Sequence, residues 1–237
     1  MAAPPVRPRN DPGQYDDLAD QWWSGRGGLA ALSWIAAARM RHIPPAKKPG
    51  SPLLDMACGG GLLAPYLKGS GYRHIGVDQS PTATAIARDH CIEAARADVR
   101  QLPFRDQAFD VVVAGEVLEH VPDLAAVVGE ACRVLRPGGT LVVDTIAATW
   151  FGRFTAITVA ERLPAGPPKR LHDGALFVDR RRLVEIADRH GVHLTLNGLR
   201  PSAVDYVWWS LGRKAEVRML STPLTASLFQ AVGTKRG

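Results

Sequence analysis

The stretch Leu53-Leu54-Asp55-Met56-Ala57-Cys58-Gly59-Gly60-Gly61 decides the fold of this chain. It begins with an apolar run that is typical of a buried parallel strand, and Pro52 precedes that run. Three glycines follow, and they allow a tight turn and a close approach of a ligand because they carry no Cβ. No Lys-Ser or Lys-Thr pair follows them, so the stretch does not predict a nucleoside-triphosphate loop.

Similar apolar runs follow along the chain. Residues 74–78 end in Asp78, whose carboxylate is suited to accept hydrogen bonds from two ribose hydroxyls. Asp98 follows the next short apolar segment, and residues 109–116 form an apolar run that ends in small residues and an acid. Residues 135–143 close a helix and open another strand. This alternation predicts an α/β fold with a parallel sheet, helices on both faces and the acids at the carboxyl edge, where ligands bind.

The order and spacing of these features resemble the class I S-adenosylmethionine-dependent methyltransferases. The resemblance implies a doubly wound, mostly parallel seven-stranded sheet of Rossmann-like fold, with an antiparallel last strand at its edge in residues 229–235. It also implies S-adenosylmethionine as the methyl donor. The donor-binding residues that it implies are Arg39, Asp55, Ala57, Gly59, Gly61, Asp78, Gln79, Asp98, Val99 and Gly115.

The glycine turn departs from this family at one position, because Ala57 stands where the family has glycine. The extra methyl is tolerated at a negative φ and strained at a positive one. A nicotinamide enzyme is the rival interpretation, since Gly59-x-Gly61-x-x-Ala64 fits the dinucleotide fingerprint. Asp55 argues against that rival, because a carboxylate beside the turn repels a pyrophosphate but not a cationic sulfonium.

Within the superfamily, the chain most resembles the O-methyltransferases of ubiquinone biosynthesis, which methylate catechol-like polyprenyl phenols. The resemblance rests on Trp22-Trp23, on a helix over residues 32–39, on residues 116–123, and on Leu171-His172-Asp173. It implies that Arg39 holds the carboxylate of the donor. Ser33 and Ala36 replace a His and an Asn of the family's first helix, which leaves the acceptor's identity open.

Methylation of a phenol requires its deprotonation, because a pKa of ~10 leaves about three units, or roughly 4 kcal/mol, to be supplied at pH 7. A base can supply this free energy, and so can a divalent cation that chelates two catechol oxygens. We therefore expect catalytic roles for Glu116, Glu119, His120 and His172. Glu116, Glu119 and His120 are candidate ligands of Mg²⁺ or another divalent cation, although Glu119 and His120 can equally serve a helix start.

The sequence predicts a single domain over residues 1–237. Residues 1–14 read as a disordered tail, 15–45 as a helical cap and 46–147 as the donor-binding core. Residues 148–178 combine aromatic residues with arginines, a mixture typical of a substrate lid or of a segment that faces a membrane. Residues 179–237 hold a C-terminal helix, strands and a second insertion.

The charge and the cysteine content of the chain limit the kinds of binding partner and compartment that we expect. The formal net charge is +6, but its basic residues are dispersed without a recognition motif, so we expect an anionic membrane surface rather than nucleic acid. The three scattered cysteines favour reduced thiols in a cytoplasmic protein, one that the net charge allows to associate peripherally with a membrane. Two alternatives to a phenol O-methyltransferase stay open. They are an N- or C-methyltransferase of a soluble natural product and a donor-binding domain without catalysis.

Overall fold

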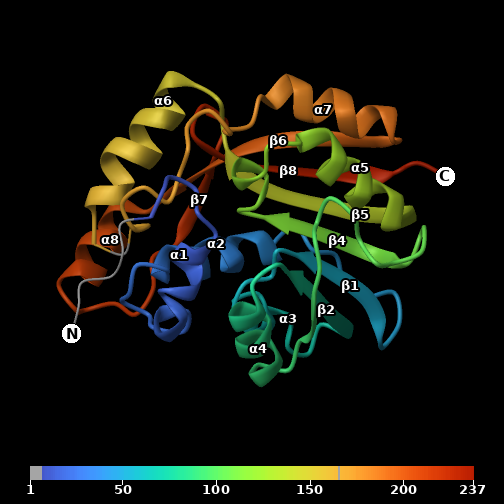
Figure 1. Ribbon diagram of the computed structural model, residues 1–237, viewed down its shortest axis with the longest axis horizontal. Coiled ribbons are helices and arrows are strands. Elements are labelled where there is room, and N and C mark those ends of the chain that lie inside the picture. Colours follow the sequence, from blue (N-terminus) through green and yellow to red (C-terminus); the bar gives the residue numbers. More distant parts are fainter. Residues whose placement is uncertain (1–6, 165) are drawn as a thin grey trace.

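The computed structural model describes residues 7–164 and 166–237. These residues form an eight-stranded sheet in the order β3-β2-β1-β4-β5-β8-β6-β7 (Figure 1). Strands β1 to β5 pair in parallel, whereas β8 pairs antiparallel with β5 and β6, and β7 pairs antiparallel with β6. The strands are β1 (Ser51–Met56), β2 (Tyr72–Asp78), β3 (Glu93–Arg96), β4 (Phe109–Gly115), β5 (Leu135–Ile146), β6 (Val192–Pro201), β7 (Met219–Thr222) and β8 (Leu228–Lys235).

The predicted doubly wound, mostly parallel sheet with an antiparallel last strand is confirmed. The sheet has one strand more than expected, because the chain turns back after α8 (Ala203–Ser210) and pairs β7 with the end of β6. The expected place of β8 at the edge is wrong, since β8 lies between β5 and β6. Phe229, Gln230 and Ala231 are buried there, as suits a strand that is paired on both sides.

Helices cover both faces of the sheet (Figure 1). Helices α5 (Leu124–Val134) and α7 (Arg180–Arg189) share one core cluster with Val112. Helices α2 (Ala30–Met40), α3 (Ala64–Leu67) and α4 (Pro81–Asp89) share another with Val111 and Val113. Successive side chains of β4 thus enter opposite cores, as the period of a strand requires. With both faces covered, the carboxyl edge of the sheet remains available for a ligand.

The N-terminal segment, residues 7–23, packs against the body of the protein. It contains α1 (Gly13–Asp16) and the 3₁₀ turn η1 (Ala19–Gln21). The prediction of a disordered tail is wrong for residues 7–14, because their polar groups find partners: the amide N–H of Asn10 and the side chain of Gln14 both donate to the carbonyl of Arg170. Residues 1–6 of that predicted tail lie outside the described residues.

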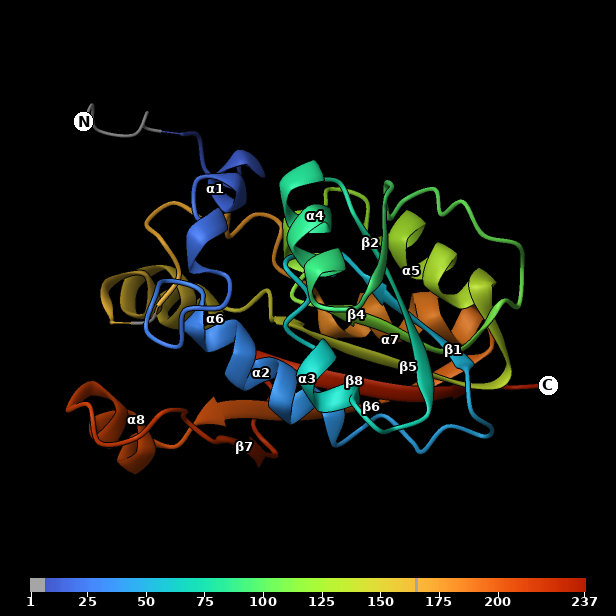
Figure 2. The same ribbon diagram turned by 90° about the horizontal axis from the view of Figure 1, so that it is seen from below.

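The two insertions lie at one end of the molecule (Figures 1 and 2). The first contains α6 (Trp150–Arg153), the π-helical turn η3 (Phe154–Val159) and the 3₁₀ turn η4 (Ala160–Arg162), and it exposes Trp150, Phe151 and Phe154. The second contains α8. No helix in residues 7–164 and 166–237 is long and apolar enough to cross a membrane.

Candidate active site

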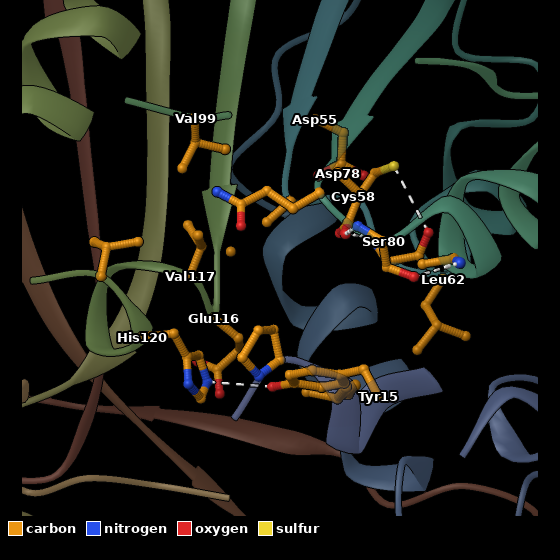
Figure 3. Close-up of a pocket in the computed structure, with 18 of the residues that line it drawn as sticks. Tyr15, Asp55, Cys58, Leu62, Asp78, Ser80, Val99, Glu116, Val117 and His120 are labelled. Atoms are coloured by element: carbon orange, nitrogen blue, oxygen red, sulfur yellow. Dashed lines mark hydrogen bonds between the residues drawn. The ribbon is translucent and has the colours of Figure 1, made fainter. Parts of the chain in front are cut away.

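A cavity of about 510 Å³ opens at the carboxyl ends of β1, β2 and β4, beside the N-terminal segment (Figure 3). This is the edge where the sequence predicted a ligand. The predicted site residues that line it are Arg39, Asp55, Ala57, Gly59, Asp78, Gln79, Val99, Gly115, Glu116 and His120. Gly61, Asp98, Glu119 and His172 do not line it.

Asp78 ends β2 with its carboxylate held by two backbone amides. The N–H of Gly59 donates to Oδ2 at 3.0 Å, and the N–H of Ser80 donates to Oδ1 at 2.9 Å. Burial raises the pKa of Asp78, and the two N–H groups work against that rise. Each carboxylate oxygen keeps a further lone pair, so this group fits a pair of ribose hydroxyls.

The glycine turn is shaped for close contact. Gly59 has a φ of +52°, and a Cβ built on it would fall 2.3 Å from the indole of Trp22, so only glycine fits. Gly61 also has a positive φ, and a Cβ on it would crowd Ala87 of α4 and Ile92, which follows that helix. Gly61 therefore lets the turn pack on α4, whereas Gly59 lies on the cavity wall.

Ala57 adopts a φ of +54°, which is the strained case for its extra methyl. An L-residue other than glycine pays about 1–2 kcal/mol in this left-handed region. We therefore expect Ala57→Gly to raise the free energy of unfolding by about 1 kcal/mol in a denaturant titration. As a control, Ala85→Gly on the exposed face of α4 should lower it by about 1 kcal/mol. A destabilised Ala57→Gly variant would contradict the strain.

Arg39 of α2 reaches across to Asp144 of β5 in a buried ion pair. Its Nε donates to Asp144 at 2.9 Å and one Nη donates at 2.5 Å. Gly115 makes room for this pair, since a Cβ there would fall 2.0 Å from Cζ of Arg39. The predicted role of Arg39, to hold a donor carboxylate, thus depends on the Nη that is not bonded to Asp144.

Two further acids at the edge have partners within the protein. Asp55 is buried and shares a hydrogen bond of 3.2 Å with Nε2 of His74. Asp98 binds the guanidinium of Arg100, whose hydrogen bonds lower the pKa of Asp98. Asp55 therefore lines the cavity with its carboxylate held by His74, whereas Asp98 is paired with Arg100 and does not line the cavity.

Glu116 and Glu119 follow β4. Burial, and then the charge of Glu119, raise the pKa of Glu116 well above its ordinary value. Burial raises the pKa of Glu119 to about 7, although Thr145 donates a hydrogen bond to its Oε2. Glu116 also has a φ of +55°, a conformation that is uncommon for residues other than glycine and enriched at functional sites. Glu116 faces the cavity, and Glu119 supports the wall behind it.

The predicted metal ligands Glu116, Glu119 and His120 do not converge. Among residues 7–164 and 166–237, no group of three His, Cys, Asp or Glu side chains could hold a metal ion. Glu119 is bonded to Thr145, and hydrogen bonds engage both ring nitrogens of His120. The arrangement of the described residues therefore gives no support to the predicted divalent cation at Glu116, Glu119 and His120.

His120 lies at one end of the cavity, with partners that the sequence did not identify (Figure 3). Its Nε2 is 3.2 Å from the hydroxyl of Tyr15, and its Nδ1 is 2.5 Å from Oδ1 of Asn10. The only signal for Tyr15 was its place in an aromatic stretch, and Asn10 gave none. His172 stacks on His120 from outside the cavity, with ring centroids 5.5 Å apart.

Comparisons with known proteins agree with this geometry. A methyltransferase domain model matches residues 54–143. The chain is 33% identical over 187 residues to a ubiquinone biosynthesis O-methyltransferase of Thiobacillus denitrificans. The aligned residues cover 76% of this chain and 81% of that protein. The chain is also 31% identical over 213 residues to a protein of the same name from Methylobacterium sp., covering 81% and 86%.

The solved structures share the fold. A methyltransferase of Thermotoga maritima, described as a possible histamine N-methyltransferase, superimposes with a TM-score of 0.66 at 19% identity and covers 94% of this chain and 97% of its own. At 19% identity, this structural similarity is evidence for a shared fold only. The relatives in sequence are closer and cover most of both chains. The chain belongs to the ubiquinone biosynthesis O-methyltransferases, a family of S-adenosylmethionine-dependent methyltransferases.

Proposed function

We propose that this enzyme methylates an oxygen of a lipophilic phenol or catechol of the quinone-precursor type. The observation that carries the proposal is a single cavity that joins a donor cradle, Gly59 with Asp78, to a neutral histidine, His120. The names of the relatives support the substrate class, since both are called ubiquinone biosynthesis O-methyltransferases.

The residues of the cavity fit the donor in chemistry. Asp78 would accept hydrogen bonds from its ribose, and Arg39 would contact its carboxylate. When bound, S-adenosylmethionine supplies a methyl group on a positively charged sulfur that an oxygen nucleophile can displace. The chain's remaining task is to orient that oxygen and to take its proton.

His120 is the favoured base. Burial, and then the nearby His172, lower the pKa of His120 to about 3, so its imidazole is neutral at pH 7 and has a lone pair available. So low a pKa makes the ring a weak base, and it accepts a proton efficiently only when a negative charge beside it raises that pKa. Once the phenol loses its proton, the phenolate beside the ring favours the imidazolium. His172, the other predicted base, does not line the cavity and instead supports the ring of His120.

A panel of acceptors tests the proposed function. The purified protein would be incubated with methyl-labelled donor and with catechols, lipophilic phenols, amines and soluble carbon nucleophiles. Transfer to catechol oxygen is the expected result. Transfer only to nitrogen or carbon would favour the alternative methyltransferase, and binding of S-adenosylhomocysteine without any transfer would favour a donor-binding domain without catalysis.

We further propose that the first insertion contacts an anionic membrane, which would give access to a lipophilic acceptor. Trp150 is 70% exposed and Phe154 is 47% exposed, with Arg153 between them. In α8 and at its C-cap, exposed apolar side chains follow one another with helical spacing at the same end of the molecule (Figure 2): Val204, Val207, Trp208 and the C-cap residue Leu211. Aromatic residues beside cations suit the boundary of a lipid headgroup layer.

Vesicle sedimentation checks this contact. The protein should sediment with anionic vesicles more than with neutral ones, and high salt should weaken the association. The double variant Trp150→Ala/Phe154→Ala should lose at least half of the bound fraction, because it removes the exposed aromatic surface, while it keeps its affinity for S-adenosylhomocysteine. If the wild-type protein ignores anionic vesicles, the insertion is only a lid.

A further inference from the structure

The side chain of Asn10 forms two hydrogen bonds with His120, one with its backbone carbonyl and one with its imidazole ring. Its amide nitrogen donates to the carbonyl oxygen of His120 at 2.9 Å. A carbonyl only accepts, so this bond places the amide nitrogen there and directs Oδ1 of Asn10 to the imidazole. The distance from Oδ1 of Asn10 to Nδ1 of His120 is 2.5 Å.

This arrangement determines the tautomer of His120. Because Oδ1 of Asn10 is an acceptor, Nδ1 of the ring must carry the hydrogen. The ring is neutral, since burial, and then His172, lower the pKa of His120 to about 3. Nε2 is therefore left as a bare acceptor, and the hydroxyl of Tyr15 at 3.2 Å must donate to it.

Tyr15 is held in place for this bond. Its ring stacks on Trp22, with centroids 5.9 Å apart, and meets the ring of His120 edge to face. Burial, and then the charges of Glu119 and Glu116, raise the pKa of Tyr15, so its hydroxyl keeps its hydrogen at neutral pH. Tyr15 also lines the cavity, so its oxygen can accept a second hydrogen bond from a ligand there.

Three other ionisable groups lie near His120: His172 and Glu161 come from a separate part of the chain, and Arg9 comes from the N-terminal segment. His172 stacks on its ring, Glu161 lies 3.8 Å from Nδ1 of His172, and Arg9 donates to the carbonyl oxygen of His172. None of the three makes a hydrogen bond to the ring of His120 among the described residues. The two ring nitrogens are therefore governed by Asn10 and Tyr15.

We propose that the N-terminal segment completes the proton-accepting site, with Asn10 as a positioning residue that fixes the Nδ1–H tautomer and Tyr15 as the group that passes the acceptor's proton to His120. This inference rests on the proposed function. In the step, Tyr15 gives its hydrogen to Nε2 of His120 while its oxygen takes the O–H hydrogen of the phenol. Tyr15 ends unchanged, His120 becomes an imidazolium and the acceptor becomes a phenolate. The imidazolium returns its proton to solvent after methyl transfer.

Nuclear magnetic resonance of ¹⁵N-labelled histidine rings tests the tautomer without any acceptor. The signal of His120 is identified by its loss in His120→Gln. The wild-type ring should carry its hydrogen on Nδ1 and remain neutral between about pH 5 and 8, as a pKa of about 3 requires. Asn10→Ala should mix the two tautomers. A wild-type ring with its hydrogen on Nε2 would overturn the inference whether or not a phenol is the acceptor.

Kinetics with the best phenol of the panel test the relay. Tyr15→Phe should lower kcat about 100-fold and leave the KM for the acceptor nearly unchanged, because it removes only the transferring oxygen. Asn10→Ala should lower kcat by about 10-fold or more. Gln14→Ala is the matched control, since it loses two hydrogen bonds of the same segment without touching His120. It should keep the wild-type tautomer, and kcat within about threefold. Full kcat in Tyr15→Phe would overturn the relay.

Discussion

Replacing Arg39 with methionine is expected to lower the free energy of unfolding by about 3–5 kcal/mol. The substitution removes one partner of a buried pair and leaves the carboxylate of Asp144, which is 0% exposed, without its cation. Gln230 donates to the same carboxylate at 3.3 Å, but a neutral amide cannot balance the charge. Denaturant titration monitored by circular dichroism measures the loss.

Arg73→Met is the matched control. Arg73 binds Glu93 through two hydrogen bonds, as Arg39 binds Asp144, but more than half of each side chain is exposed. Exposed pairs contribute little because water already solvates both charges, so this variant should unfold almost as the wild type does. Equal losses in both variants would mean that burial does not set the importance of the Arg39 pair.

Replacing Asp78 with alanine is expected to weaken donor binding by about 2–4 kcal/mol, or roughly 30- to 700-fold in Kd. The carboxylate is held by Gly59 and Ser80 with a lone pair to spare on each oxygen, and charge-assisted bonds to two hydroxyls are strong in a partly dry site. Isothermal calorimetry with S-adenosylhomocysteine measures the change.

Asp98→Ala provides the comparison for this measurement. Asp98 stands at the same edge of the sheet, but its carboxylate is engaged by Arg100 and does not line the cavity. Its loss should weaken donor binding less than the loss of Asp78 does. Wild-type affinity in Asp78→Ala would mean that the donor cradle lies elsewhere in the cavity.

Local sequence signals predicted the donor half of the site well. The apolar runs before Asp55, Asp78 and Glu116 specify buried parallel strands, and parallel strands bring their carboxyl ends to one edge. Glycines mark the turn because no other residue fits beneath Trp22. Each of these signals lies within a few residues of the feature that it specifies.

The remaining features depend on contacts between distant parts of the chain. Asn10 and His120 are 110 positions apart, and nothing in the segment around Asn10 indicates its partner. The place of β8 depends on pairing with β5 and β6 rather than on its own residues. The predicted metal ligands depend on such contacts too, since Glu119 and His120 are neighbours in sequence but form hydrogen bonds with different partners, Thr145 and Tyr15.

The donor cradle and the N-terminal residues beside His120 come from different parts of the sequence. The matched domain, residues 54–143, contains the cradle for the donor, whereas Asn10 and Tyr15 lie upstream of it. A change in this short leading stretch can therefore alter the proton-accepting site proposed above while the donor cradle stays intact. Similarity confined to the matched domain then passes on the methyl source of a relative without passing on its substrate.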